Sequence, residues 1–452
     1  MLLAVKILIG LLGLGVVVLI HELGHFLAAR LVKINVEAFS IGWGNPILKK
    51  KIGAVEYRLG MFPVGGYCKM KGETDYNKAW ENMEQGIKPE EGSYLAASPL
   101  ARILVAFAGP FFNLIFAIIL LSFIWGFGFE INTIGNKIIL ASEIIKEETF
   151  PADKAGFKTG DRIMEIDNKS INYYHEIQEN IALNPSKTLP VIVERDGKIL
   201  ELQVTPNLDK SSGAGKIGVI YWIDPVIESV KQGSIAEGAG LIPGDRIITL
   251  NGNPVKNSED FKRIRESSDF PGSFIVKYER KGMLSETEFY LDNSREEIGF
   301  TWETIRYRTP NLSIFAAVSK GFQEGVKTLK ISITSLRLLF MGIDLTQAVS
   351  GPVRITYMIG DMAAQGFGQG VSSGLRSLAE FIALISIALC VMNLLPLPII
   401  DGGMIILFFI EMIRKKPIPP KAVSIFQTCG MVIIGGLFIF AVLGDIMFFV
   451  RG

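Results

Sequence analysis

The chain has 452 residues, of which 49% are hydrophobic and 20% are charged, and its formal net charge at pH 7 is +1. This length allows several domains, while the near-neutral charge gives no support for nucleic-acid binding. The three cysteines, Cys68, Cys390 and Cys429, are scattered, which excludes a disulfide framework and a cysteine zinc cluster. Because charged residues are concentrated in the middle of the chain, we expect membrane-spanning segments on both sides of a soluble insert.

The first predicted element is a membrane-spanning helix from about Leu2 to Val32, long enough to cross a bilayer core of roughly 30 Å at 1.5 Å per residue. Its apolar run is interrupted by His21, Glu22 and His25. Residues four apart share a helical face, so both histidines can bind one metal ion, and Glu22 can accept a proton from an attacking water. Ionisable groups in such a helix indicate function. The alternatives are a histidine pair in a soluble helix or a signal peptide, although the lone Lys6 disfavours the latter.

The segment that follows, up to Arg102, is rich in lysine and arginine, so the positive-inside rule places it in the cytoplasm and the N-terminus outside. Within it, residues 55–70 contain strand-forming residues, a proline and a Gly-Gly pair, and predict a hairpin-like β element. Its apolar tip, residues 61–64, would suit insertion into the membrane beside the histidines. An ordinary surface hairpin is the alternative.

A second membrane-spanning helix is predicted from Ile103 to Phe127. Gly109 and Pro110 near its start permit close helix approach or a kink, and Asn113 is a polar group within it. The sequence leaves open whether these three residues serve helix packing or a role near the histidines.

The soluble insert, from Glu130 to about Trp302, contains an internal repeat. Residues 150–168 are echoed by residues 233–252, each with an Ala-Gly step, a Gly-Asp turn and the alternating apolar residues of a strand. A helical stretch and another strand follow each copy.

This repeat resembles two PDZ domains, at residues 128–206 and 217–302, joined by a linker near Asn207 to Lys216. PDZ domains usually bind an extended peptide by adding it to a sheet edge. The alternative is that the two modules act as steric filters and have no peptide ligand.

The remainder of the chain returns to an apolar composition. Residues 311–345 carry apolar side chains at three- and four-residue steps among several charges, and predict an amphipathic helix on the membrane surface or packed on the core. The Gly/Ser-rich stretch up to Gly374 is expected to be loop and short helix. Membrane spans three and four are predicted at 375–395 and 423–449, so the membrane domain comprises residues 1–127 and 374–452. Four spans place both termini and the insert outside.

The third span runs into MNLLPLPIIDGG, residues 392–403, where two prolines break the helix and Gly402 and Gly403 allow tight turns. Asp401 in this stretch lies on the same side of the membrane as the histidines. It can therefore supply the third protein ligand that a catalytic zinc requires. A loop-capping aspartate is the alternative.

Three separated motifs carry a resemblance: HELGH, the Gly-Pro-x-x-Asn of the second span, and Asn-x-x-Pro-x-Pro-x-x-Asp-Gly. Together they resemble the site-2 protease family of intramembrane zinc metalloproteases. The tandem PDZ-like insert and the length are similar to its RseP type, the regulators of sigma-E protease. The resemblance implies that Zn²⁺ is bound by His21, His25 and Asp401 and that Glu22 is the catalytic base. It also implies substrate contacts from Asn393 and from a membrane-reentrant β-loop at residues 55–70, which includes Phe62, Pro63, Val64, Gly65 and Gly66.

The expected fold is therefore a polytopic α-helical membrane protein with four spans, a membrane-associated β-hairpin and two inserted PDZ-like α+β domains. The expected function is cleavage of single-span membrane proteins inside the bilayer of the bacterial inner membrane, in regulated intramembrane proteolysis. By resemblance, the substrates are an anti-sigma factor already trimmed on its periplasmic side and remnant signal peptides. The resemblance also implies that this proteolysis serves envelope stress signalling. One alternative is a PDZ-containing membrane scaffold with a structural zinc, which would have no need of Glu22. A transporter is a further alternative, although the spans have few polar residues.

Overall fold

The structure, a computed structural model, describes residues 3–73, 90–145, 149–210, 213–294, 296–339, 351–368 and 370–451. The chain divides into two compact units. The membrane unit consists of Met1–Phe129 and Pro310–Gly452, and the insert unit of Glu130–Thr309.

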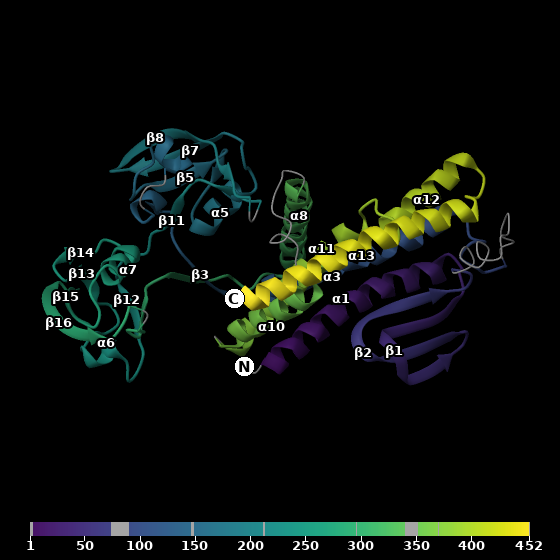
Figure 1. Ribbon diagram of the computed structural model, residues 1–452, viewed down its shortest axis with the longest axis horizontal. Helices are drawn as coiled ribbons and strands as arrows, with labels where there is room; N and C mark the ends of the chain where they lie inside the picture. Colours follow the sequence, from purple (N-terminus) through teal and green to yellow (C-terminus); the bar gives the residue numbers. More distant parts are fainter. Residues whose placement is uncertain are drawn as a thin grey trace. The chain divides into compact units, whose positions relative to one another are not determined.

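Four helices of the described chain are long and apolar enough to cross a membrane (Figure 1): α1 (Leu3–Leu31), α3 (Pro99–Phe127), α11 (Val371–Asn393) and α13 (Pro420–Arg451). They coincide with the four predicted spans, but the last three begin several residues earlier than predicted. A proline at the first helical position explains two of these starts, since its missing N–H has no partner there in any case. Ser98 also caps α3 by accepting a hydrogen bond from the Ala101 backbone.

Among its described residues the membrane unit has three further helices, α8 (Ile314–Leu339), α10 (Pro352–Gly368) and α12 (Asp401–Arg414). The sequence predicted loop and short helix where the 17-residue α10 lies, and no helix at α12. Asp445 of α13 stabilises the start of α10, because its carboxylate accepts hydrogen bonds from the backbone N–H groups of Gly351, Val353 and Arg354. That cap comes from about ninety residues further along the chain, so no local pattern could indicate it.

Helix α8 covers the described part of the predicted amphipathic segment, and residues 340–345 of that prediction lie outside the described residues. It packs on α3 through glycines: a Cβ atom on Gly321 would lie 2.6 Å from the Ser122 backbone nitrogen, and one on Gly325 would lie 2.8 Å from Ile118. The first residues of the predicted apolar stripe are exposed, Phe315 by 90% and Phe322 by 55%, whereas Leu329 packs on the buried cluster of Ala117, Ala383 and Ile387. Close backbone approach through small residues is typical of membrane helices.

The β element of the membrane unit differs from the predicted hairpin at 55–70. Strands β1 (Val36–Ile52) and β2 (Val55–Met70) pair antiparallel, and residues 38–41 of β1 pair with both 56–59 and 66–69 of β2. The two halves of β2 therefore lie on opposite sides of β1 and do not pair with each other. Bends at Gly44 and Gly65, whose φ angles are 91° and 79°, allow this arrangement because glycine adopts positive φ without strain.

The curled β1–β2 sheet lies beside the C-terminal half of α1 (Figure 1). Phe26 and Ala29 of α1 form a buried cluster with Phe39 of β1, Cys68 of β2 and Phe408 of α12. This apolar cluster fixes the sheet against the helix that carries both histidines.

A buried ion pair joins the start of α3 to the end of α12. The two terminal nitrogens of Arg102 donate to the two carboxylate oxygens of Glu411 at 3.2 and 2.5 Å, and both side chains are almost fully buried. The Arg102 guanidinium also lies 4.6 Å from the ring centroid of Phe408. Helix α12 is therefore held in a defined position against α3.

The insert unit contains two lobes of similar construction. Each has a four-stranded antiparallel sheet, in the orders β6-β5-β7-β8 and β14-β13-β15-β16, and one longer helix. The bounds are β5 (Arg162–Ile166), β6 (Lys169–Ser170), β7 (Leu189–Arg195), β8 (Lys198–Val204) and α5 (Tyr174–Ala182) in one lobe, and β13 (Arg246–Leu250), β14 (Asn253–Pro254), β15 (Gly272–Arg280), β16 (Met283–Leu291) and α7 (Ser258–Glu266) in the other.

The repeated Gly-Asp step has the same structural role in both lobes. Asp161 and Asp245 are buried, and each accepts two hydrogen bonds of 2.7 Å from an arginine at the end of a central strand, Arg195 or Arg280. Such bidentate pairs fix the turn against the sheet. The internal repeat of the sequence is thus matched by a repeated buried contact.

The segment 207–216, expected to be a linker, packs with the first lobe. It forms β9 (Asn207–Leu208) and β10 (Gly215–Lys216), and the following β11 (Val219–Tyr221) pairs with β4 (Ile138–Leu140). Ile217 is 3% exposed in the core of that lobe. The first lobe therefore extends to about Tyr221, because β11 pairs with β4 in a separate two-stranded sheet that the repeat pattern does not contain.

Both ends of the insert meet in one two-stranded ribbon. Strand β3 (Glu130–Thr133) pairs with β18 (Ile305–Arg308), so that Glu130 lies opposite Arg308. The second lobe is closed by β12 (Ile227–Val230) against β17 (Phe300–Trp302). The short helices of the unit are η1 (Ala141–Glu143), α4 (Pro151–Lys154) and α6 (Ile235–Gly238).

Candidate metal centre

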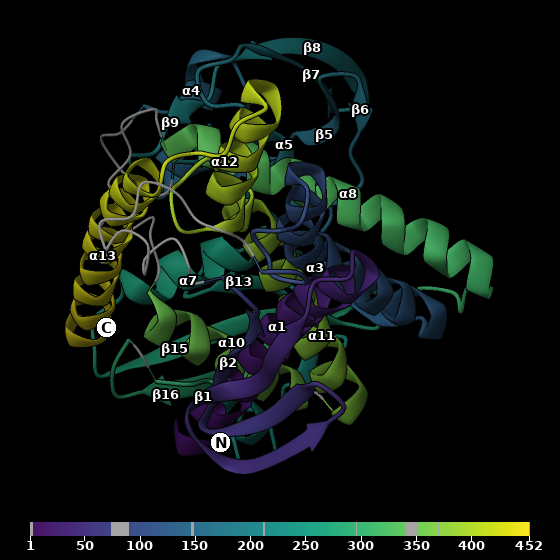
Figure 2. The ribbon, with the colours of Figure 1, turned by 90° about the vertical axis from the view of Figure 1, so that its right-hand side faces the viewer.

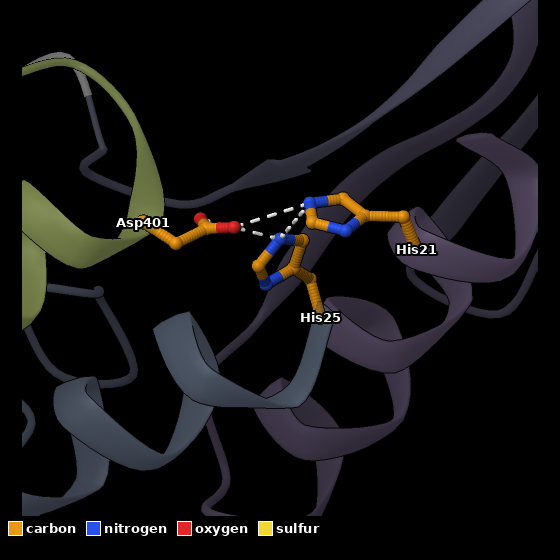
Figure 3. A group of neighbouring side chains, drawn as sticks. All are labelled: His21, His25 and Asp401. Atoms are coloured by element: carbon orange, nitrogen blue, oxygen red, sulfur yellow. Dashed lines mark hydrogen bonds and ion pairs between the residues drawn. The ribbon is translucent and has the colours of Figure 1, made fainter. Parts of the chain in front are cut away.

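Three side chains converge from two helices (Figure 3). His21 and His25 lie one turn apart on α1, and Asp401 is the first residue of α12. The two histidine Nε2 atoms are 3.1 Å apart. The Asp401 oxygens lie 3.2 Å from the Nε2 of His21 and 3.5 Å from the Nε2 of His25. All three donor atoms therefore lie within one small volume.

This donor set fits a zinc ion. Zinc bonds of roughly 2.0–2.2 Å to nitrogen and oxygen in a tetrahedron place neighbouring ligand atoms about 3.3 Å apart, close to the distances observed. One Asp401 oxygen, Oδ2, is buried and accepts no hydrogen bond from the described residues, which is costly unless a cation compensates it. Three protein ligands are also the number that leaves one position of a catalytic zinc open.

The ring of His25 is oriented for metal binding by α3. Its Nδ1 lies 2.8 Å from the backbone carbonyl oxygen of Val105, which can only accept a hydrogen bond. The proton of the neutral imidazole therefore resides on Nδ1, and Nε2 keeps its lone pair for a metal. No motif in the sequence marks a backbone carbonyl, so this contact could not be predicted.

Gly109 of α3 lies directly against the two histidine rings. A Cβ atom at this position would be 2.4 Å from Nε2 of His25 and 2.8 Å from Cε1 of His21. Gly24 of α1 faces α3 in the same way, since its Cβ would lie 2.4 Å from the Ala108 carbonyl oxygen. The sequence left open whether Gly109 serves helix packing or a role near the histidines. The structure shows that it packs directly against both histidine rings.

We predict that Gly109→Ala lowers zinc affinity, because the added methyl group displaces the imidazoles. The expected loss is at least about tenfold, the size seen when groups that orient metal ligands are removed. Gly126→Ala is the matched control on the same helix, since its Cβ would meet only the Ala317 side chain at 3.6 Å. Chelator competition on both purified variants measures the affinities. Equal affinities would contradict the close contact at Gly109.

Asp401 is held in place by the loop between α11 and α12. A Cβ on Gly402 would lie 2.1 Å from the Leu395 carbonyl oxygen, and one on Gly403 would lie 2.0 Å from that of Leu397. The two glycines are helical residues of α12 and do not form the predicted tight turns. They are small so that the preceding loop can pack against the helix that presents Asp401.

Glu22 faces β2. Its carboxylate lies close enough to His25 and Asp401 to interact with both electrostatically. A Cβ on Gly66 would lie 3.7 Å from the Glu22 Cγ atom, so β2 passes close beside this side chain. The Cys68 thiol is not one of the converging donors, and burial raises its pKa.

A cavity of about 320 Å³ lies beside the converging side chains. His25 and Asp401 line it, together with Cys68, Met70, Tyr94, Val105, Ile399 and Met404. Its position beside the proposed ligands gives room for a water molecule or part of a substrate.

The remaining predicted site residues are Asn393 at the end of α11 and residues 62–66 of β2. Asn393 is the last residue of α11 and is half-buried, eight residues before Asp401. Phe62 is 60% exposed and lies opposite Trp43 of β1. Pro63 and Val64 follow it in β2. Gly65 is at the bend and Gly66 lies beside Glu22, as described above. The structure thus brings Gly66 to the acidic group, and leaves the roles of the others as predictions.

Comparison with known proteins identifies related chains that match this one over nearly its whole length. The model of the family described as Peptidase family M50 matches residues 9–437. A protein of Treponema pallidum named a zinc metalloprotease is 34% identical, covering 98% of this chain and 99% of its own. A similarly named protein of Borreliella burgdorferi is 31% identical and covers 96% of each chain. The regulator of sigma E protease of Haemophilus influenzae is 29% identical and covers 97% of each.

Proposed function

Since this chain belongs to peptidase family M50, the site-2 proteases, and is a zinc metalloprotease, we propose that it cleaves single-span membrane proteins within the bilayer. In this proposal His21, His25 and Asp401 hold the zinc, and Glu22 is the general base. The convergence of these three donor atoms beside Glu22 is the observation that carries the proposal. A scaffold with a structural zinc, the alternative from the sequence, is disfavoured by membership in a peptidase family.

The chemistry follows from the positions of the chain's own groups. Zinc, when bound, supplies Lewis-acid activation of water and of the scissile carbonyl. Glu22 accepts a proton from the attacking water and returns it to the departing amine. Strand β2 passes close beside the Glu22 side chain at Gly66 and limits its movement.

The depth of the site supports cleavage inside the membrane. His21 lies ten residues before the end of α1, which corresponds to about 15 Å of helix at 1.5 Å per residue. Because α1 is long and apolar enough to span the bilayer, a site at that level lies well within it.

A helical substrate must unwind before its backbone can reach this site, and β2 offers a surface for the extended segment. Residues 66–69 pair with β1 on one side only, among the residues described, and this edge runs past Glu22. We therefore propose that the substrate adds as a strand to this edge. Asn393 and residues 62–66 would hold its backbone, as the family resemblance implies.

We propose that the protein resides in a bacterial inner membrane, with the insert and both termini in the periplasm. The lysines at 49–51, all exposed in β1, support a cytoplasmic position for the sheet by the positive-inside rule. A relative named regulator of sigma E protease supports a role in envelope stress signalling. The proposed substrates are accordingly a trimmed anti-sigma factor and remnant signal peptides.

The two insert lobes, which we propose are PDZ-like, would exclude proteins that still carry a folded outer domain. Glu130 and Arg308 are paired residues, so a short Gly-Ser linker can replace the whole insert. We predict that this deletion variant, in liposomes, cuts both a trimmed substrate and one bearing a folded periplasmic domain, whereas the intact protein cuts only the trimmed one. Mass spectrometry should locate each cut inside the apolar segment.

Equal zinc content in the two proteins is the control for damage caused by the deletion. A deletion variant that keeps zinc but no longer cuts the trimmed substrate would show that the lobes capture peptide, which contradicts the filter. Cuts confined to the soluble flanks of the substrate would contradict intramembrane cleavage.

A further inference from the structure

Asn113 of α3 is a fully buried amide, 0% exposed, in contact with His21. Its Nδ2 lies 3.4 Å from the Nδ1 atom of His21, and its Oδ1 is buried with no hydrogen-bond partner among the described residues. We propose that Asn113 is a positioning residue, whose amide oxygen accepts the Nδ1 proton of His21 and so directs Nε2 of that ring to the zinc. This inference rests on the proposed assignment of His21 as a zinc ligand.

The protonation chemistry of the ligand decides which amide atom must face it. A neutral histidine that binds a metal through Nε2 carries its proton on Nδ1, so Nδ1 is a donor and needs an acceptor. The amide NH₂ group is also a donor and cannot meet this need. A rotation of 180° about χ2 exchanges Oδ1 and Nδ2 with almost no change of shape. It gives His21 its acceptor and gives the unpartnered oxygen a donor.

The neighbouring histidine shows the same arrangement already formed. Nδ1 of His25 lies 2.8 Å from the carbonyl oxygen of Val105, which is also on α3, about two turns before Asn113. One helix therefore provides an acceptor for each of the two histidines. At His21 the acceptor would be the side-chain oxygen of Asn113, whose Nδ2 now lies 3.4 Å from Nδ1 of that ring.

The backbone of Asn113 is fixed independently of its amide. The hydroxyl of Ser386 on α11 donates to the Asn113 carbonyl oxygen at 2.9 Å, and Ser386 is 0% exposed. This contact joins α3 and α11 at the level of the amide without touching His21. It supplies a control that separates helix packing from ligand orientation.

The test is zinc affinity, measured by chelator competition on the purified full-length protein, together with the visible absorption spectrum after Co²⁺ substitution. Asn113→Asp keeps an oxygen acceptor and loses the NH₂ donor, so it should bind zinc at least as tightly as the wild type. Asn113→Leu keeps the approximate volume and loses the acceptor, so its affinity should fall by about 10–100-fold. Its Co²⁺ spectrum should also change. Ser386→Ala should leave both readouts unchanged.

The outcomes distinguish this inference from the proposed function. His21→Ala should lower zinc affinity more than Asn113→Leu, and if it has no effect, the ligand assignment itself fails. If His21→Ala lowers the affinity but Asn113→Leu does not, only the role of Asn113 is overturned. Equal losses in the Asp and Leu variants would show that the NH₂ donor or packing matters, which also overturns it. Should the Leu variant not fold, Asn113→Ala takes its place in the comparison.

Discussion

Glu22→Gln should abolish proteolysis while zinc remains bound. Glutamine preserves the size of the side chain, but its amide cannot take a proton from water. Positioned general bases contribute roughly 10²–10⁴-fold to reaction rates. The turnover of a single-span substrate should therefore fall by at least about 100-fold. Zinc content should not change, since Glu22 is not one of the three converging donors.

The matched control for this variant is Glu37→Gln, the same chemical change on the exposed surface of β1, where Glu37 pairs with Lys69. Exposed ion pairs contribute little to stability, so this control should retain normal turnover. Normal turnover by Glu22→Gln itself would remove Glu22 from the mechanism. Loss of zinc from that variant would indicate a structural role instead.

Asp401→Ala should lose zinc, because two imidazoles alone form a weak site and a catalytic zinc normally has three protein ligands. We expect proteolysis to be lost together with the metal. Asp401→Asn retains one oxygen donor without the negative charge and should bind zinc with intermediate affinity. Metal analysis after dialysis measures occupancy in both variants. Full occupancy in Asp401→Ala would mean that the third ligand lies elsewhere in the chain.

The spacing of the two histidines and the predicted sidedness of the spans were sufficient to predict that His21, His25 and Asp401 converge. A four-residue step on one helix places two rings together, and membrane topology brings Asp401 to the same level from more than 370 residues away. Both rules depend on local pattern or on the bilayer, so they can be applied without knowledge of tertiary packing. The four long apolar helices were predicted for the same reason.

The features that the sequence did not predict depend on contacts between distant segments. The carbonyl of Val105 has no side-chain signature, and helix α10 begins where Asp445 of α13 caps it. Residues 38–41 pair on both sides with β2, which no local turn signal indicates. The sequence predicted α8 as a helix on the membrane surface or packed on the core, and no local pattern indicated that the glycines at 321 and 325 make its contact with α3.

The distance along the chain between the converging donors has a consequence for biosynthesis. Asp401 follows His25 by 376 residues, and the entire insert is made between them. At translation rates of roughly 5–20 residues per second, about 20–75 s separate the synthesis of the second histidine from that of the aspartate. If the proposed ligands bind the zinc, a nascent chain lacks a complete metal centre until Asp401 has been made. On the proposed ligand assignment, the order of synthesis itself delays the appearance of a competent peptidase until the last part of the chain has entered the membrane.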